Sequence, residues 1–285
     1  MQSRKLSLAT GLTYHVLEWD GPGDLTFVLV HGFSDLAYGW TEVAARLAPH
    51  GHVIAPDLRG HGDSDWIGPG GYYHYMDYVA DLDDVIRQLA RPRVVLVGHS
   101  MGGGVCSYYT GTRPERPAAL ALLEGLGPAD LTDVDGPTRT AAWIDAWRAA
   151  RSQLRPVRTM ASLDEAVRRL RRNDDRLDEA RARQLAELGT RAVDGGLVWK
   201  HDPLHMTFGP YPFRLATAIK YWQRIACPVL IIDGADSKLT LPADERARRR
   251  AHFAGHRHVV IDGAGHMIPR HQPARVAELL LELAA

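Results

Sequence analysis

The segment VVLVGHSMGGG, residues 94–104, contains the serine best placed for chemistry. Its apolar first half is typical of a buried strand, and a helical pattern begins directly after Ser100. A G-x-S-x-G pattern at such a junction predicts a tight, strained turn, in which Gly98 and Gly102 avoid collisions with the neighbouring strand and helix. The turn would hold the Ser100 hydroxyl at the helix N-terminus, where the N–H of Met101 can face a developing oxyanion. We therefore predict that Ser100 is a nucleophile.

A serine hydroxyl needs a neighbouring base to react near neutral pH. Among the 14 histidines, His266 follows an apolar run and ends the glycine-rich turn DGAGH, which lets the loop fold back over the strand ends. His31, His61 and His99 are expected to pack or to brace loops. His271 has no metal-ligand partner at a suitable spacing and is expected at the surface. His266 is therefore the candidate base.

A carboxylate is needed to orient the imidazole and to stabilise its charged form. Two acidic residues follow apolar runs and satisfy the order serine, acid, histidine: Glu124 in ALALLEGLGP and Asp236 in CPVLIIDGADSKLT. A carboxylate beside a buried central strand is costly unless it is paired, which disfavours a chance position for Glu124. Asp236 could instead be a turn residue that caps a helix starting near Leu241. The residues alone leave both acids open.

These side chains depend on the elements that position them. Continuous apolar runs, typical of strands covered on both faces, recur at 26–32, 52–60, 93–100, 118–125, 228–234 and 257–266. Helical patterns lie between several of these runs, at about 40–49, 77–90, 101–112, 243–253 and 273–284. The alternation predicts an α/β fold with a mostly parallel, doubly wound sheet. An antiparallel hairpin over residues 5–19 is expected at one edge.

About a hundred residues interrupt this alternation between the fourth and fifth of these runs. Most of them are helical in pattern, and an aromatic stretch without clear periodicity, GGLVWKHDPLHMTFGPYPF, follows. An insertion of this length predicts a helical subdomain rather than a loop. We therefore expect a core formed by residues 1–127 and 223–285 and a helical cap formed by residues 128–222.

Four motifs in this order resemble the α/β-hydrolase family over nearly the whole chain. They are LVHGF at 29–33, PDLRGHGDSD at 56–65, the G-x-S-x-G at 98–102 and GAGHMIPRHQP at 263–273. The resemblance implies an α/β-hydrolase sheet of about eight strands with a cap after the sixth strand. It also implies that the N–H of Phe33 is a second oxyanion donor and that His266 is the base.

The same resemblance bears on the acid. Most of the family carries the acid three residues beyond a glycine after the seventh strand, and Ser237 occupies that position here, with Asp236 one place too early. Haloalkane dehalogenases look similar to this chain in placing their acid after the strand that ends at Glu124. We favour Glu124 as the acid and keep Asp236 as the alternative.

Ser100, His266 and a carboxylate would form an acyl-transfer site. A serine at position 100 argues against the dehalogenase and epoxide hydrolase relatives, which use a carboxylate nucleophile. We predict a carboxylesterase acting on small to medium apolar or aromatic esters, with carbon–carbon hydrolysis, lactone hydrolysis, perhydrolysis or ligand binding with little turnover as alternatives. The predicted pocket lies between sheet and cap. Its lining is predicted to include Phe33, Tyr38, Trp40, Trp143, Trp147, Trp199, His205, Met206 and Phe208.

Composition narrows the partners. The 285 residues contain 34 Lys and Arg against 34 Asp and Glu, so no global field favours nucleic acid or an anionic membrane. The start of the chain lacks an apolar signal segment, and no later run is long enough to span a bilayer. We expect a cytoplasmic enzyme with a small-molecule substrate and without a cofactor or metal.

Overall fold

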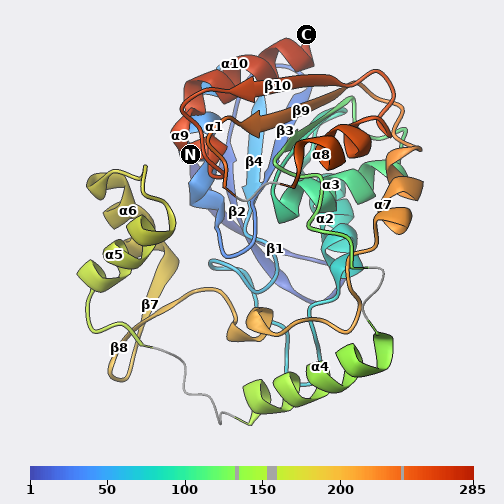
Figure 1. Cartoon of the computed structure of the whole chain (residues 1–285). Helices are drawn as coiled ribbons and strands as arrows, with labels where there is room; N and C mark the ends of the chain where they lie inside the picture. The colour runs from blue at the N-terminus through green and yellow to red at the C-terminus, as the bar shows by residue number, and fades with distance from the viewer. Residues whose placement is uncertain (132–134, 153–158, 239–240) are drawn as a thin grey trace.

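A computed structural model describes residues 1–131, 135–152, 159–238 and 241–285. Its centre is an eight-stranded sheet in the order β1-β2-β4-β3-β5-β6-β9-β10 (Figure 1). The strands are β1 (Gln2–Ser7), β2 (Thr13–Trp19), β3 (Leu25–Val30), β4 (His52–Pro56), β5 (Arg93–His99), β6 (Ala119–Leu123), β9 (Val229–Gly234) and β10 (Arg257–Ile261). β2 pairs antiparallel with β1 and β4, and the other pairs are parallel. The predicted sheet, including its antiparallel edge, is confirmed.

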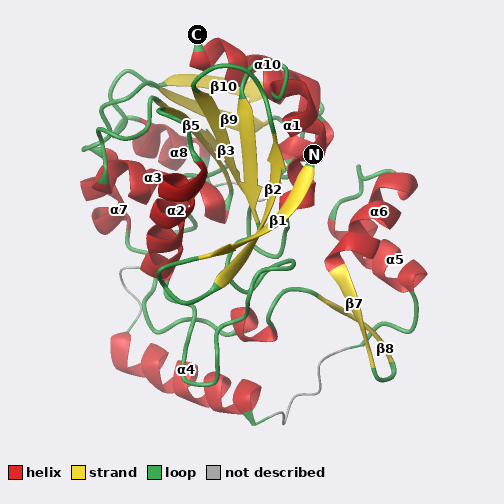
Figure 2. Cartoon of the chain, turned by 180° about the vertical axis from the view of Figure 1, so that it is seen from behind, coloured by secondary structure: helices red, strands yellow, loops and turns green. Residues whose placement is uncertain are grey.

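Helices cover both faces of the sheet (Figures 1 and 2). The core on one face includes side chains of α2 (Tyr75–Leu89), α3 (Met101–Thr112) and α7 (Leu215–Trp222). The core on the other face includes side chains of α1 (Thr41–Leu47), α9 (Ile268–His271) and α10 (Pro273–Ala284). α8 (Ala243–Arg250) lies between β9 and β10 in the chain. Because β3, β4 and β6 are buried at every position, their sequences are mostly apolar rather than alternating.

The parallel strands bring several distant loops to one edge of the sheet. Gly98 on β5 is in register with Val30 on β3, and His99 is in register with Leu123 on β6. The loops that follow β3, β5, β6, β9 and β10 therefore leave the sheet together at its carboxyl edge, where ligands bind in open parallel sheets.

The segment between β6 and β9 contains α4 (Gly136–Arg151), α5 (Leu163–Asn173), α6 (Glu179–Gly189), β7 (Thr190–Val193), β8 (Gly196–Trp199), the 3₁₀-helix η2 (Pro203–Met206) and α7. α4, α5 and α6 follow the predicted helical patterns, and Figure 1 shows them outside the sheet. The β7–β8 hairpin was not predicted, although Asp194-Gly195 at its turn is a typical hairpin signal. α7 packs against α3, and its Trp222 is buried in the core beside the sheet.

Within the described ranges, every helix is too short or too polar to traverse a bilayer.

Candidate active site

Ser100 occupies the turn between β5 and α3 in a strained backbone conformation, with φ 52° and ψ −118°. The turn is tightly enclosed. A Cβ at Gly98 would lie 2.5 Å from the carbonyl oxygen of Gly102, and one at Gly102 would lie 2.4 Å from that of Val30. Among the described residues, the non-glycine positions with positive φ are Ser34, Ser100 and Glu124. Such strain persists only where the surrounding structure enforces it, and it is concentrated at functional sites.

His266 lies between Ser100 and Glu124. Its Nε2 is 3.0 Å from the Ser100 hydroxyl oxygen, and its Nδ1 is 3.3 Å from Oε2 of Glu124. Because an ionised carboxylate only accepts hydrogen bonds, Nδ1 carries the imidazole proton and Nε2 is left to accept from the serine hydroxyl. This arrangement joins three residues from the loops after β5, β6 and β10.

Glu124 is the acid that the structure brings to His266. Its side chain is 3% exposed. The Gly234 N–H donates to its Oε1 at 2.9 Å, and the Ser237 hydroxyl donates to its Oε2 at 2.8 Å. Burial alone would raise the pKa of Glu124, but the hydrogen bonds from His266, Gly234 and Ser237 outweigh burial and lower it. The carboxylate is therefore held in its charged form.

Asp236, the alternative acid, points elsewhere. Its side chain is 44% exposed and forms an ion pair with Arg176 at 2.9 Å. Its backbone N–H donates to the carbonyl oxygen of Ala264 at 2.9 Å, so the residue helps to join the two loops without approaching His266. Ser237 occupies the position where the family usually carries its acid. Its hydroxyl donates to the carboxylate of Glu124, which follows β6.

Replacing Ser237 with alanine should weaken the pH-dependent part of stability. A hydrogen bond to a charged group contributes about 1.5 to 3 kcal/mol, so Ser237→Ala should be less stable than the parent at neutral pH. The lowered pKa of Glu124 means that this contribution is present above the unfolded-state pKa and is lost as pH falls through the folded-state pKa. The difference in unfolding free energy between variant and parent should therefore shrink from neutral pH to about pH 3.5 in urea titrations. A difference in unfolding free energy that stays constant with pH would contradict this prediction. Ser152→Ala, at an exposed position, is the control.

The loop after β3 lies directly against Ser100, since a Cβ at Gly32 would be 3.0 Å from the Ser100 Cβ. The next residue is Phe33, and Met101 opens α3, where its N–H has no carbonyl one turn earlier in the helix. Two histidines brace this loop. The Leu58 N–H donates to Nε2 of His31 at 2.9 Å, and the Ser34 N–H donates to Nε2 of His61 at 3.2 Å. Both histidines must be unprotonated at Nε2 to accept these bonds.

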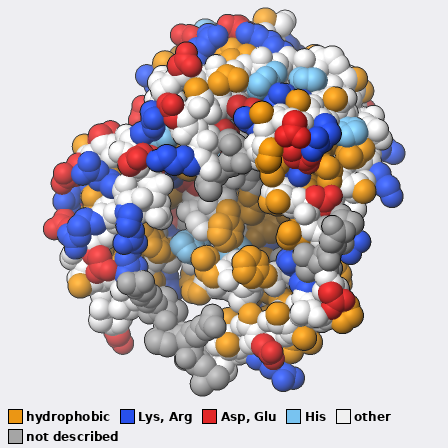
Figure 3. Space-filling model, in the orientation of Figure 1, with side chains coloured by type: hydrophobic (Ala, Val, Ile, Leu, Met, Phe, Trp, Pro, Cys, Tyr) orange, Lys and Arg blue, Asp and Glu red, His pale blue; other side chains and the backbone are white. Residues whose placement is uncertain are grey.

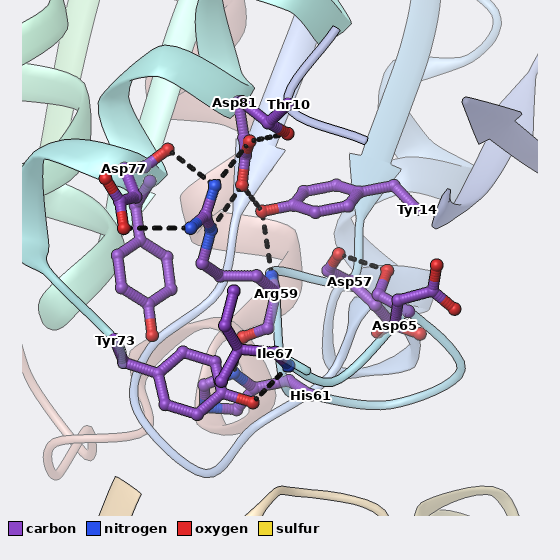
Figure 4. A network of polar contacts seen from close by, with 12 residues as sticks. Thr10, Tyr14, Asp57, Arg59, His61, Asp65, Ile67, Tyr73, Asp77 and Asp81 are labelled. Carbon is purple, nitrogen blue, oxygen red and sulfur yellow. Dashed lines mark hydrogen bonds and ion pairs between the residues drawn. The ribbon is translucent and has the colours of Figure 1, made fainter. Parts of the chain in front are cut away.

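A buried ion pair lies close to His61 (Figure 4). The Arg59 guanidinium donates to both carboxylate oxygens of Asp81, at 2.6 and 2.7 Å, and contacts Asp77 at 3.0 Å. The Tyr14 hydroxyl donates to Asp81 and accepts from the Arg59 N–H at 2.8 Å. Nδ1 of His61 donates to the Arg59 carbonyl oxygen at 3.0 Å, while its Nε2 accepts from Ser34. His61 therefore joins the loop after β4 to the loop that carries Phe33.

Two further histidines hold the loop of His266. Nε2 of His99 donates to the His266 carbonyl oxygen at 2.8 Å; burial, followed by repulsion from His266, lowers the pKa of His99 to about 4. The expectation that His271 is a surface residue is wrong, since its side chain is 6% exposed. It accepts from the Gly265 N–H at 3.0 Å and donates to Asp174 at 2.7 Å. Asp174 follows α5, so this contact links the segment between β6 and β9 to the loop of His266.

Ser100, Glu124 and His266 border a cavity of about 1080 Å³. Figure 3 shows hydrophobic side chains gathered around a hollow on this face. The lining comes from α2, α3, α7, the start of α4 and the chain before α7. Its larger apolar and aromatic members are Phe33, Tyr75, Met76, Met101, Tyr108, Pro210, Tyr211, Pro212, Phe213 and Trp222.

Of the side chains predicted to line the pocket, Phe33 borders this cavity and the others do not. Trp40 is in the core beside the sheet, and Trp199 packs on the core of α5 and α6. Tyr38 stacks on His15, and Trp143 packs edge-on against Tyr72. His205 stacks on Tyr73 at 3.7 Å and hydrogen-bonds Tyr78 at 2.7 Å, and Met206 is 66% exposed. The cavity is lined by other side chains of the sheet core and of the segment between β6 and β9.

Among the residues that the structure describes, one group of side chains has ligand atoms close enough for a metal ion, namely His15, Asp57 and Asp63. Its central carboxylate is already engaged. Asp57 accepts from the N–H groups of Ala37 and Asp63 at 2.6 and 2.9 Å and from Nδ1 of His15 at 2.7 Å. This donor set fits a structural hydrogen-bonded cluster better than a metal centre.

The chain belongs to the alpha/beta hydrolase family, whose model matches residues 27–279. It is 28% identical to Epoxide hydrolase A of Mycobacterium tuberculosis over 98% of this chain and 96% of that protein. It is 35% identical to Lipase LipV of the same species over 147 residues, 52% of each chain. Among solved structures, a thioesterase domain from the curacin biosynthetic pathway matches with a TM-score of 0.87 and 25% identity, over 99% of both chains. The names of these three proteins indicate different substrates, and all three name a hydrolytic enzyme.

Proposed function

We propose that the protein is a serine hydrolase that acts through an acyl-enzyme on Ser100, and that it is a carboxylesterase for small to medium apolar or aromatic esters. The main support is the hydrogen-bonded series Ser100, His266, Glu124 at the edge of an apolar cavity. A nucleophile, a base and an orienting carboxylate in this geometry are the requirements of acyl transfer.

In the proposed reaction, His266 Nε2 takes the proton of Ser100 as the hydroxyl oxygen attacks the ester carbonyl. Glu124 stabilises the imidazolium that forms. The N–H groups of Met101 and Phe33 donate to the oxyanion, and each such donor is worth about 2.7 to 4 kcal/mol in comparable sites. His266 then protonates the departing alcohol. Water, deprotonated by His266, attacks the acyl-enzyme, and the acid is released as Ser100 regains its proton.

The relationship to an epoxide hydrolase does not extend to the nucleophile. Epoxide opening by the related enzymes requires a carboxylate that forms an alkyl ester, whereas position 100 is a serine. Serine alkoxide chemistry fits carbonyl substrates. Thioesters are a second candidate substrate class, favoured by the likeness to the thioesterase domain, and they would pass through the same acyl-enzyme.

The test combines a panel of p-nitrophenyl esters from acetate to palmitate with labelling by a fluorophosphonate probe. We expect turnover that is greatest for short to medium or aromatic acyl groups, together with stoichiometric labelling of the parent and none of Ser100→Ala. Acyl thioesters assayed by thiol release test the second class. Labelling without turnover of any ester or thioester would overturn the esterase proposal, and absence of labelling would overturn the serine mechanism.

A further inference from the structure

Among the described residues that line the apolar cavity, Arg214 is the one lysine or arginine, and it has no acidic partner in the described part of the chain. Among its described lining residues, the side chains charged at neutral pH apart from histidine are Glu124 and Arg214. Glu124 is committed to His266, Gly234 and Ser237. Arg214 is exposed, and its guanidinium forms no hydrogen bond or ion pair within the described part of the chain. The buried arginines Arg59 and Arg249, by contrast, are each paired with an acid.

The chain around Arg214 directs it to the cavity border. Arg214 precedes the first residue of α7 and makes no side-chain capping bond there. Phe213 on one side and Thr217 and Ala218 on the other line the same cavity. The Leu215 N–H, at the start of α7, donates to the carboxylate of Asp130 at 3.4 Å. The positive end of α7 adds to the charge of the guanidinium at this border.

We propose that Arg214 selects acyl groups that carry an anionic group, a carboxylate or a sulfonate or sulfate, on the chain beyond the scissile carbonyl. This inference rests on the proposed esterase function and narrows its substrate. The planar guanidinium presents paired N–H donors that match two oxygens of such a group. Beside apolar walls this interaction is less screened than in bulk water, and it would favour the anionic acyl group over a neutral one of equal length. The acyl group is the part concerned, because it stays on Ser100 through both chemical steps.

The test compares matched substrates. Mono-p-nitrophenyl esters of succinic, glutaric and adipic acids are assayed against neutral p-nitrophenyl esters of the same chain length, with ω-sulfonated esters as a second arm. For at least one length, we expect kcat/KM of the parent to favour the anionic ester by about tenfold or more, a preference typical of one charge-assisted contact. The carboxylate and sulfonate arms identify which anion fits. The preference should fall as salt is added, because Arg214 is exposed.

Arg214→Met should reduce the ratio of kcat/KM for the anionic ester to kcat/KM for the neutral ester of equal length to about one, since the charge that distinguishes the two esters is lost. Lys220→Met is the matched control, because it removes one charge from the same helix and Lys220 does not line the cavity. An equal preference in parent and Arg214→Met, or no anionic preference at any length, would overturn the inference while neutral turnover leaves the esterase proposal intact. Absence of turnover of both the anionic and the neutral esters by the parent would overturn the esterase proposal itself.

Discussion

Glu124→Gln is expected to lower kcat for p-nitrophenyl esters by roughly 10³- to 10⁴-fold, as loss of the orienting carboxylate does in serine protease triads. The carboxylate accepts from Nδ1 of His266, from the Gly234 N–H and from the Ser237 hydroxyl. Glutamine offers only one acceptor oxygen. If that oxygen keeps the Gly234 bond, the amide N–H faces Nδ1 and favours the imidazole tautomer with its proton on Nε2. That tautomer cannot take the proton of Ser100.

Asp236→Asn is the matched control, because it neutralises the other candidate acid with the same change of charge. It loses an exposed ion pair to Arg176, and such pairs contribute about 0 to 1 kcal/mol, so turnover should change no more than a few-fold. Thermal unfolding of both variants separates loss of function from loss of fold. Parent-like activity of Glu124→Gln, or an equal loss in Asp236→Asn, would remove Glu124 from the proposed mechanism.

Gly102→Ala is expected to destabilise the protein severely. A Cβ at this position would lie 2.4 Å from the carbonyl oxygen of Val30 and 2.5 Å from that of His31, both of them backbone atoms at the end of β3. Neither can yield without moving the turn of Ser100 or the loop of Phe33. Overpacking of this kind costs about 1 to 3 kcal/mol and sometimes more. We expect a clear fall in the urea midpoint, together with loss of turnover in whatever folded protein remains.

Gly104→Ala, two residues along the same helix, is the control for helix propensity and side-chain size. The nearest atom to a Cβ at Gly104 is the Tyr75 hydroxyl oxygen at 2.1 Å, at the far end of an exposed side chain that can move. Stability should therefore change by less than about 1 kcal/mol, and alanine is the better helix former. Equal stability of the two variants would show that the enclosure of the turn is not what fixes Ser100.

The positions of most strands could be predicted because burial on both faces of the sheet leaves a local pattern in the sequence. β3, β4, β5 and β6 are buried on both faces and read as mostly apolar runs, and the glycines around Ser100 mark a junction that few other residues could form. The β7–β8 hairpin escaped prediction because strands of four residues give too short a pattern for periodicity to register.

The positions of site residues could be predicted where residue type and chain order constrain them. They could not be predicted where they depend on packing between residues far apart in the sequence. An acid ending a buried strand needs a partner, so Glu124 could be favoured from sequence. His271 could not be placed, because its partner Asp174 lies 97 residues away in the cap. The pocket residues were missed for a related reason: an aromatic side chain such as Trp40 has the same sequence signature in a core as in a cavity, and only the docking of α4 and α7 distinguishes them.

The position of Glu124 directly after β6 determines which catalytic residues would stay together if the chain were cut into two polypeptides. β5, α3 and β6 form one continuous strand–helix–strand unit that carries both Ser100 and Glu124, and His266 arrives only after β10. A break in the chain between α6 and β9 would leave the serine and the glutamate together in one polypeptide and the histidine in the other. Neither piece would contain all of Ser100, Glu124 and His266. Hydrolysis by a mixture of the two pieces would therefore show that they had reassociated.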